Sequence, residues 1–341
     1  MQSMIVQNLT SPSVLFFALG LAAALFKSDL KFPPALSESL SIYLLAAIGL
    51  KGGIELSKHA WSDLAAPITG TLLLGTLIPV AVFAISRWIK LDRKNAAALA
   101  ATYGSVSIVT FGAAAAYAEQ AGMPYESFMS AMVVVLESPA IFISLLILGW
   151  LDAKRKKANG KPAYAAGIVA TSSQGGAGRL DMRLIKESLL GKSVLLMLGA
   201  MAVGLIGGSD AQPVVKPLFV DLYPGVLMLF LLGMGITAGE RLAEVKSHGP
   251  KLIVLAVAFP LAFGMIGVAV GSWCGLSAGG MLLMGVLGAS SSYIAAPAAL
   301  RHSVPEANPS IYLGMSLGIT FPFNLIIGLP VYAKLAVWLA A

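Results

Sequence analysis

The chain has 341 residues, of which 57% are hydrophobic and 11% charged, and its mean hydropathy is +0.84. This composition predicts a multi-pass membrane protein and leaves no stretch that would form a separate soluble domain. Its one cysteine, Cys274, excludes an internal disulfide and a cysteine metal cluster, and no HExxH, Walker loop or dinucleotide motif is present. The net charge of +7 is explained by basic cytoplasmic loops, so no nucleic-acid partner is expected.

Ten apolar runs are long enough for membrane spans of about 20 residues. They are expected at 10–27, 35–56, 64–86, 95–119, 126–151, 187–208, 216–238, 249–273, 277–301 and 308–335. The first run has no basic start and no clear cleavage site, so it is interpreted as a retained span and not as a signal peptide. Most of the 23 basic residues follow odd-numbered spans, which predicts cytoplasmic loops there and both termini outside a bacterial inner membrane.

Each half of the chain holds an odd number of predicted spans, so the second half must enter the membrane from the opposite side. The predicted fold is therefore an all-α membrane protein of ten transmembrane helices, arranged as a 5+5 inverted repeat. The repeats are expected at 1–152 and 187–341, joined by a cytoplasmic linker at 153–186. In the linker, a plain connection is favoured over a docking segment for a regulatory partner. Segments 48–53 and 234–239 match one another, and both contain the Gly-x-x-x-Gly spacing that allows helices to approach closely.

Two polar breaks interrupt apolar runs, at 104–112 in the fourth span and at 288–293 in the ninth. Hydrocarbon cannot hydrogen-bond an unwound backbone, so such breaks need a cavity or a ligand. Matching breaks in the two halves are typical of the binding site of a secondary transporter. The predicted substrate-binding residues are Gly104, Ser105, Ser107, Thr110, Ser290, Ser291 and Ser292.

Three further polar residues, Glu137, Thr320 and Asn324, fall at the same predicted depth and are assigned to ion binding or coupling. Helix N-termini at the breaks favour an anion, while hydroxyls and free carbonyls suit a hard cation such as Na⁺. A small anion carried with Na⁺ is the simplest interpretation, with no other metal and no cofactor. The alternatives are that the serines only pack helices and that Glu137 is a protonated structural group. Lys51 and Glu55 are expected to extend to the outer interface.

The sequence resembles the SbtA-type sodium-dependent bicarbonate transporters over essentially its whole length. The resemblance is carried in the second half by 289–292, 296–297, 300–301 and 304–314, and in the first half by Gly104, Val106, Ser107, Thr110, 113–115, 125–126 and 137–139. It departs from the cyanobacterial members at three places. Tyr293 replaces an aspartate, Ile108-Val109 replace Gly-Ser, and Glu137 replaces an aspartate.

This resemblance implies crossed broken helices in spans four and nine, within a core domain made of spans 3–5 and 8–10. A gate domain, made of spans 1, 2, 6 and 7, would move against it. The resemblance also implies a homotrimer, bicarbonate bound where the half-helices meet, Na⁺ as the coupling ion, and a PII-like regulatory protein on the cytoplasmic face.

The predicted function is secondary active import of bicarbonate by Na⁺ symport through alternating access. One alternative is a transporter of another small anion such as a carboxylate, coupled to H⁺ through Glu137. Another is a channel or sensor that binds bicarbonate without pumping it. An intramembrane enzyme is not expected, because no serine has a His or Lys partner at mid-depth and no paired-aspartate motif is present.

Overall fold

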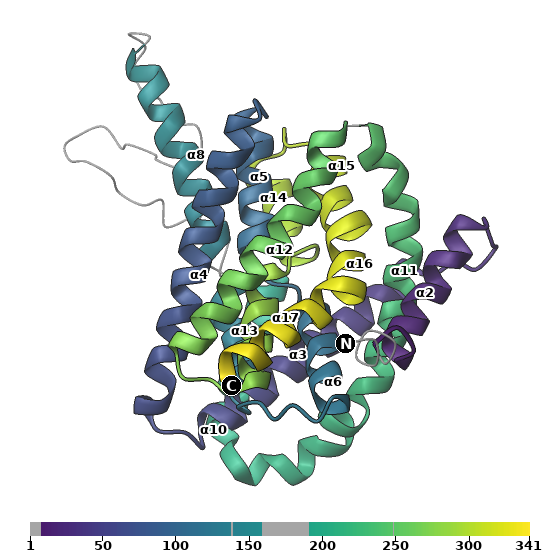
Figure 1. The fold of residues 1–341 in the computed structure, drawn as a ribbon, viewed down its shortest axis with the longest axis vertical. Coiled ribbons are helices and arrows are strands. Elements are labelled where there is room, and N and C mark those ends of the chain that lie inside the picture. Colours follow the sequence, from purple (N-terminus) through teal and green to yellow (C-terminus); the bar gives the residue numbers. More distant parts are fainter. Residues whose placement is uncertain (1–7, 138, 159–190, 248) are drawn as a thin grey trace.

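A computed structural model describes residues 8–137, 139–158, 191–247 and 249–341 (Figure 1). Within these residues the fold is all-helical and has no β-strand. The α-helices are α2 (Pro12–Leu25), α3 (Pro34–Leu56), α4 (Trp61–Trp88), α5 (Arg93–Gly104), α6 (Ile108–Gln120), α7 (Met129–Glu137), α8 (Pro139–Ala158), α10 (Lys192–Lys216), α11 (Tyr223–Ser247), α12 (Pro250–Trp273), α13 (Ala278–Ala289), α14 (Ala295–Ser303), α15 (Pro309–Leu313), α16 (Phe321–Phe323) and α17 (Leu329–Ala340). Three π-helical turns are η1 (Pro217–Asp221), η2 (Gly314–Thr320) and η3 (Asn324–Gly328). Most of the predicted linker, 159–186, lies outside the described residues.

Seven helical stretches in the described part of the chain are long and apolar enough to cross a membrane. They are Pro34–Leu56, Trp61–Trp88, Arg93–Gln120, Met129–Gly149, Lys192–Leu242, Pro250–Trp273 and Pro309–Ala340. Two shorter apolar helices are Pro12–Leu25 and Ala278–Ala289. The prediction of an all-α, multi-pass membrane protein is therefore confirmed.

The sixth and seventh predicted spans have different boundaries from those expected. Instead of ending at 208, α10 continues to Lys216 past a kink at Gly208, whose φ of 53° lies in the left-handed region that glycine adopts readily. The π-turn η1 follows, and α11 begins only at Tyr223. The apolar run ends at the kink, because Ser209, Asp210 and Gln212 follow Gly208, whereas the helical backbone continues through these polar residues.

Close backbone contacts join α2 to α11 and α3 to α10. A Cβ added to Gly49 or Gly53 would overlap backbone atoms of α10, and one added to Gly235 would overlap the backbone of α2. Gly239 also faces α2. The two predicted Gly-x-x-x-Gly segments therefore lie at close helix contacts, as their spacing indicated. Figure 1 shows α2 beside α11 at one edge of the bundle.

The most deeply buried helices are the short ones that precede the two breaks. Every residue of α5 from 96 to 104 is buried, and so is every residue of α13 from 279 to 289. Both segments are rich in Ala and Gly, so neighbouring helices can approach them on all sides. The breaks that follow them are consequently held at the centre of the bundle.

Candidate functional site

Both predicted breaks are present, with bounds that differ from 104–112 and 288–293 because 108–112 and 288–289 are helical, and they are hydrogen-bonded to one another. Residues 105–107 separate α5 from α6, and residues 290–294 separate α13 from α14. The Ser107 N–H donates to Ser290 Oγ at 3.1 Å, and the Ser292 N–H donates to the Thr102 carbonyl at 2.8 Å. In Figure 1, α5 and α14 lie in the upper part of the bundle, and α6 and α13 lie lower. The half-helices α6 and α14 therefore start at one common point and run in opposite directions.

One serine in each break accepts an amide N–H from the first turn of the half-helix that follows it. Ser107 Oγ accepts the Thr110 N–H at 3.1 Å, and Ser292 Oγ accepts the Ala296 N–H at 3.1 Å. An N-cap satisfies only one of the free amide groups in the first helical turn. The remaining amides and the helix dipole leave partial positive charge at the start of both α6 and α14.

A small cavity, here called the break cavity, lies between these two helix starts. Its volume is about 10 Å³, which is room for about one water molecule. It is lined by Leu45, Val106, Ser107, Ile108, Glu137, Ser193, Ser292, Tyr293, Ile294 and Ala295. Glu137 is 1% exposed, and its Oε2 atom has no hydrogen-bond partner among the described residues. The cavity thus brings a buried carboxylate to two helix N-termini.

The other predicted substrate residues surround this cavity without lining it. Ser105 Oγ donates to the Glu137 carbonyl at 3.2 Å, which anchors the helix where Pro139 interrupts it. Ser291 Oγ lies 2.7 Å from Ser316 Oγ in η2. Thr110 is buried. The remaining two have packing or bonding roles: Ser290 Oγ bonds the Leu287 carbonyl, and Gly104 packs against Pro79 and Ala140.

Thr320 and Asn324 serve the backbone near the breaks. Thr320 Oγ1 donates at 2.6 Å to the carbonyl of Ala256, the group that Pro260 leaves without its helical donor. The same oxygen lies 2.6 Å from the Tyr103 hydroxyl. Asn324 Nδ2 donates at 2.8 Å to the Ala289 carbonyl, at the end of α13. Their polar groups therefore bond to residues of α5, α12 and α13, and they do not line the break cavity.

Replacing Thr320 by valine should destabilise the protein by about 1–3 kcal/mol, because it leaves the Ala256 carbonyl buried without a donor. Thermal unfolding of the purified protein in detergent measures this change. Thr69→Val is the matched control, since Thr69 is exposed and bonds only within its own helix. Equal midpoints for the two variants would contradict this role of Thr320.

Seven lining residues are not among the predicted site residues: Leu45, Val106, Ile108, Ser193, Tyr293, Ile294 and Ala295. Leu45 comes from α3 and Ser193 from the start of α10, and no local pattern distinguishes either from its neighbours. Tyr293 directly follows the triple serine, and this position within the predicted break is the sequence feature that could have identified it as a lining residue. Its hydroxyl is close to Ser107 but makes no hydrogen bond of normal geometry within the described residues. It closes one side of the break cavity.

A helical membrane bundle whose centre holds two broken helices, with their N-termini around a carboxylate, has the architecture of a secondary transporter. The chain matches the family model of the Na⁺-dependent bicarbonate transporter superfamily over residues 12–337, and it belongs to that family. A search of curated proteins found no match. Because the protein belongs to this family, it is a transporter and not an enzyme. The family is defined by Na⁺-dependent transport of bicarbonate.

Proposed function

We propose that this protein imports bicarbonate together with Na⁺ by alternating access, with both ions bound at the break cavity. The observation that carries the proposal is the meeting of two half-helix N-termini at a cavity that also contains Glu137. The helix ends attract an anion without any Lys or Arg in the cavity lining. The unpaired Glu137 oxygen and the hydroxyls of Ser107 and Ser292 are the hard oxygen ligands that suit Na⁺.

The volume of the break cavity supports a mechanism that requires movement. Bicarbonate has four heavy atoms, whereas the cavity has room for about one water molecule. One wall is formed by Leu45 of α3 and Ser193 of α10, and the opposite wall is formed by the breaks. Separation of α3 and α10 from the broken helices would admit the anion. We infer that α2, α3, α10 and α11 form the gate domain and that α4–α8 with α12–α17 form the core domain.

Reciprocal contacts support the ten-span inverted repeat. The helices α5 and α13 have 12 residues each, and each is followed by a break and a half-helix. Asn95 Oδ1, at the start of α5, accepts the Asn308 N–H of the loop before α15 at 2.7 Å. Conversely, Glu126 Oε1, in the loop before α7, accepts the Ser277 N–H at the start of α13 at 2.7 Å. A side chain from each half thus accepts a backbone N–H from the other half, and such reciprocal contacts are expected of two repeats related by a pseudo-two-fold axis. The homotrimer, the PII-like partner, the inner-membrane location and the outside termini stay predictions.

Purified protein in liposomes should take up radiolabelled bicarbonate with saturable kinetics, and an inward Na⁺ gradient should accelerate this uptake because both ions bind one site. The measurement compares initial rates with an inward Na⁺ gradient, with equal Na⁺ on both sides, and with K⁺ replacing Na⁺. A flux that neither saturates nor responds to an ion gradient would favour a channel or a sensor instead.

A second candidate is a transporter of another small anion, such as a carboxylate, coupled to H⁺. It is favoured by the unpaired Oε2 of Glu137, because a buried carboxylate without a partner can carry a proton. Uptake that is insensitive to Na⁺, is driven by a pH gradient and is abolished in Glu137→Gln would select this candidate over Na⁺ symport.

A further inference from the structure

A second cavity, here called the Lys51 cavity, lies one helical turn away from the break cavity. Its volume is about 150 Å³. It is lined by Ser13, Ala47, Ile48, Lys51, Phe111, Gly112, Ala115, Ala116, Glu119, Tyr125, Ser127, Ser130, Phe219, Val220, Tyr223, Pro224 and Leu227. The two cavities share no lining residue, but both border α3 and α6. By the predicted orientation, the Lys51 cavity faces the outside.

Lys51 lies between two adjoining cavities. Lys51 lines this cavity and also an adjoining one of about 70 Å³. Within the described part of the chain, no hydrogen bond or ion pair is found for it. The sequence-based expectation that Lys51 extends to the membrane interface does not account for a side chain that borders two cavities.

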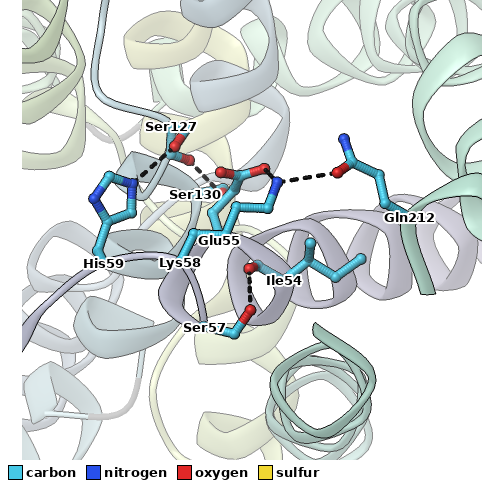
Figure 2. A network of polar contacts seen from close by, with 8 residues as sticks. All are labelled: Ile54, Glu55, Ser57, Lys58, His59, Ser127, Ser130 and Gln212. Atoms are coloured by element: carbon cyan, nitrogen blue, oxygen red, sulfur yellow. Dashed lines mark hydrogen bonds and ion pairs between the residues drawn. The ribbon is translucent and has the colours of Figure 1, made fainter. Parts of the chain in front are cut away.

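The acidic groups around this lysine have other partners. Figure 2 shows the carboxylate of Glu55 paired with Lys58, at 2.9 Å, and Lys58 also bonding Gln212 at 3.1 Å. Lys51 contributes to the field at Glu55 from further away. Glu119 Oε1 accepts the Tyr125 hydroxyl at 2.8 Å. Burial raises the pKa of Tyr125, and Glu119 raises it further, so that this hydroxyl stays protonated and keeps its bond to the carboxylate.

Tyr223 of α11 lines the Lys51 cavity and packs against α6. Its hydroxyl occupies the space that a side chain on Gly112 of α6 would need, so the ring of an α11 residue lies directly on α6. The hydroxyl is buried and has no hydrogen-bond partner among the described residues. An unpaired buried donor is costly, and an oxyanion in the Lys51 cavity would supply its acceptor.

We propose that the Lys51 cavity is a second site for a small oxyanion, which bicarbonate occupies before it reaches the breaks. The Lys51 ammonium provides the charge, and the Tyr223 hydroxyl donates a hydrogen bond. The proposal rests on the proposed function, in which bicarbonate is the transported anion. Lysine suits this role because its flexible point charge attracts an anion over a distance without fixing it in one geometry.

Lys51→Gln should raise the half-saturation concentration for bicarbonate by about tenfold at low ionic strength and leave the maximal rate unchanged. The effect should shrink at high salt, because added ions screen the lysine in the wild type. Lys51→Arg should behave as the wild type. Lys216→Gln is the matched control: it removes the same charge, but Lys216 is exposed, pairs with Asp221 and lines neither cavity. Unchanged half-saturation in Lys51→Gln would overturn the proposal.

Two further measurements are needed. The first controls for misfolding, and the second detects binding without any transport assay. Tyr223→Phe removes only the hydroxyl and should raise the half-saturation concentration without lowering thermal stability. In the purified wild type, bicarbonate should protect Lys51, but not Lys216, from an amine-acylating reagent, as quantified by mass spectrometry. Protection without Na⁺-dependent uptake would refute the proposed function and keep this site. Normal uptake without protection would refute the site alone.

Discussion

Ser107→Ala and Ser292→Ala should each reduce Na⁺-dependent bicarbonate uptake by about tenfold. Each substitution removes the acceptor of an amide in the first turn of a half-helix, and it also removes a hydroxyl from the break cavity. The two losses together amount to about 1–2 kcal/mol, which corresponds to about a tenfold change in rate or affinity. Initial uptake rates in proteoliposomes, corrected for the amount of folded protein, measure the effect.

Ser277→Ala is the matched control for this experiment. Ser277 Oγ accepts the Gly280 N–H at 3.2 Å, which is the same kind of bond, but Ser277 lies at the opposite end of α13 from the break. It should lower stability by about 1 kcal/mol and leave the half-saturation concentration unchanged. If the three alanine variants transported equally well, the break cavity would not be the binding site.

Gly53→Leu should prevent the protein from folding or lower its unfolding free energy by about 3 kcal/mol or more. Any Cβ at this position would overlap the Met201 carbonyl oxygen of α10, and backbone atoms cannot move aside as a flexible side chain can. The helices α3 and α10 would have to separate. Size-exclusion profiles and thermal unfolding of the detergent-solubilised protein report the loss.

The control for the glycine experiment is Gly199→Leu on α10. Gly199 is exposed, and a Cβ there would meet no atom within 4 Å. The substitution should therefore be tolerated, because it adds an apolar side chain to a surface that is expected to face lipid. A Gly53→Leu variant as stable as Gly199→Leu would show that the α3–α10 contact is not close in the folded protein.

The chain belongs to the family although it lacks some side chains of the cyanobacterial pattern, and the geometry of the break cavity explains how both can hold. Tyr293 and Ile108, which replace an aspartate and a glycine of that pattern, both line the break cavity. The features that favour an anion are the amides and dipoles at the helix starts, and these depend on backbone conformation more than on those two side chains. Glu137 supplies a carboxylate in the same cavity.

Much of the architecture follows from the order of the residues. Hydrophobic runs of sufficient length indicate helices in a membrane, because an unpaired backbone is intolerable in hydrocarbon. The same principle identifies the breaks, because Gly and Ser in the middle of a span weaken the helix, and the freed backbone groups then need a cavity or a ligand. Gly49 and Gly53 indicate a close helix contact, because their Gly-x-x-x-Gly spacing lets two backbones approach one another, and a Cβ at either position would overlap α10. These are local consequences of composition and spacing, and they do not depend on which helix lies next to which.

The roles of individual polar side chains depended on the tertiary structure. Thr320 and Asn324 have the same residue types as ion ligands, yet they bond the carbonyls of Ala256 and Ala289, on other helices. Lys51 is expected at the outer interface from its place in the sequence, and in the folded protein it lines two cavities. Hydrogen bonds are short and directional, so a shift of one helical turn changes which partner a polar side chain reaches. Helix positions are therefore readable from sequence, whereas the partner of each polar atom is decided only when the helices are packed.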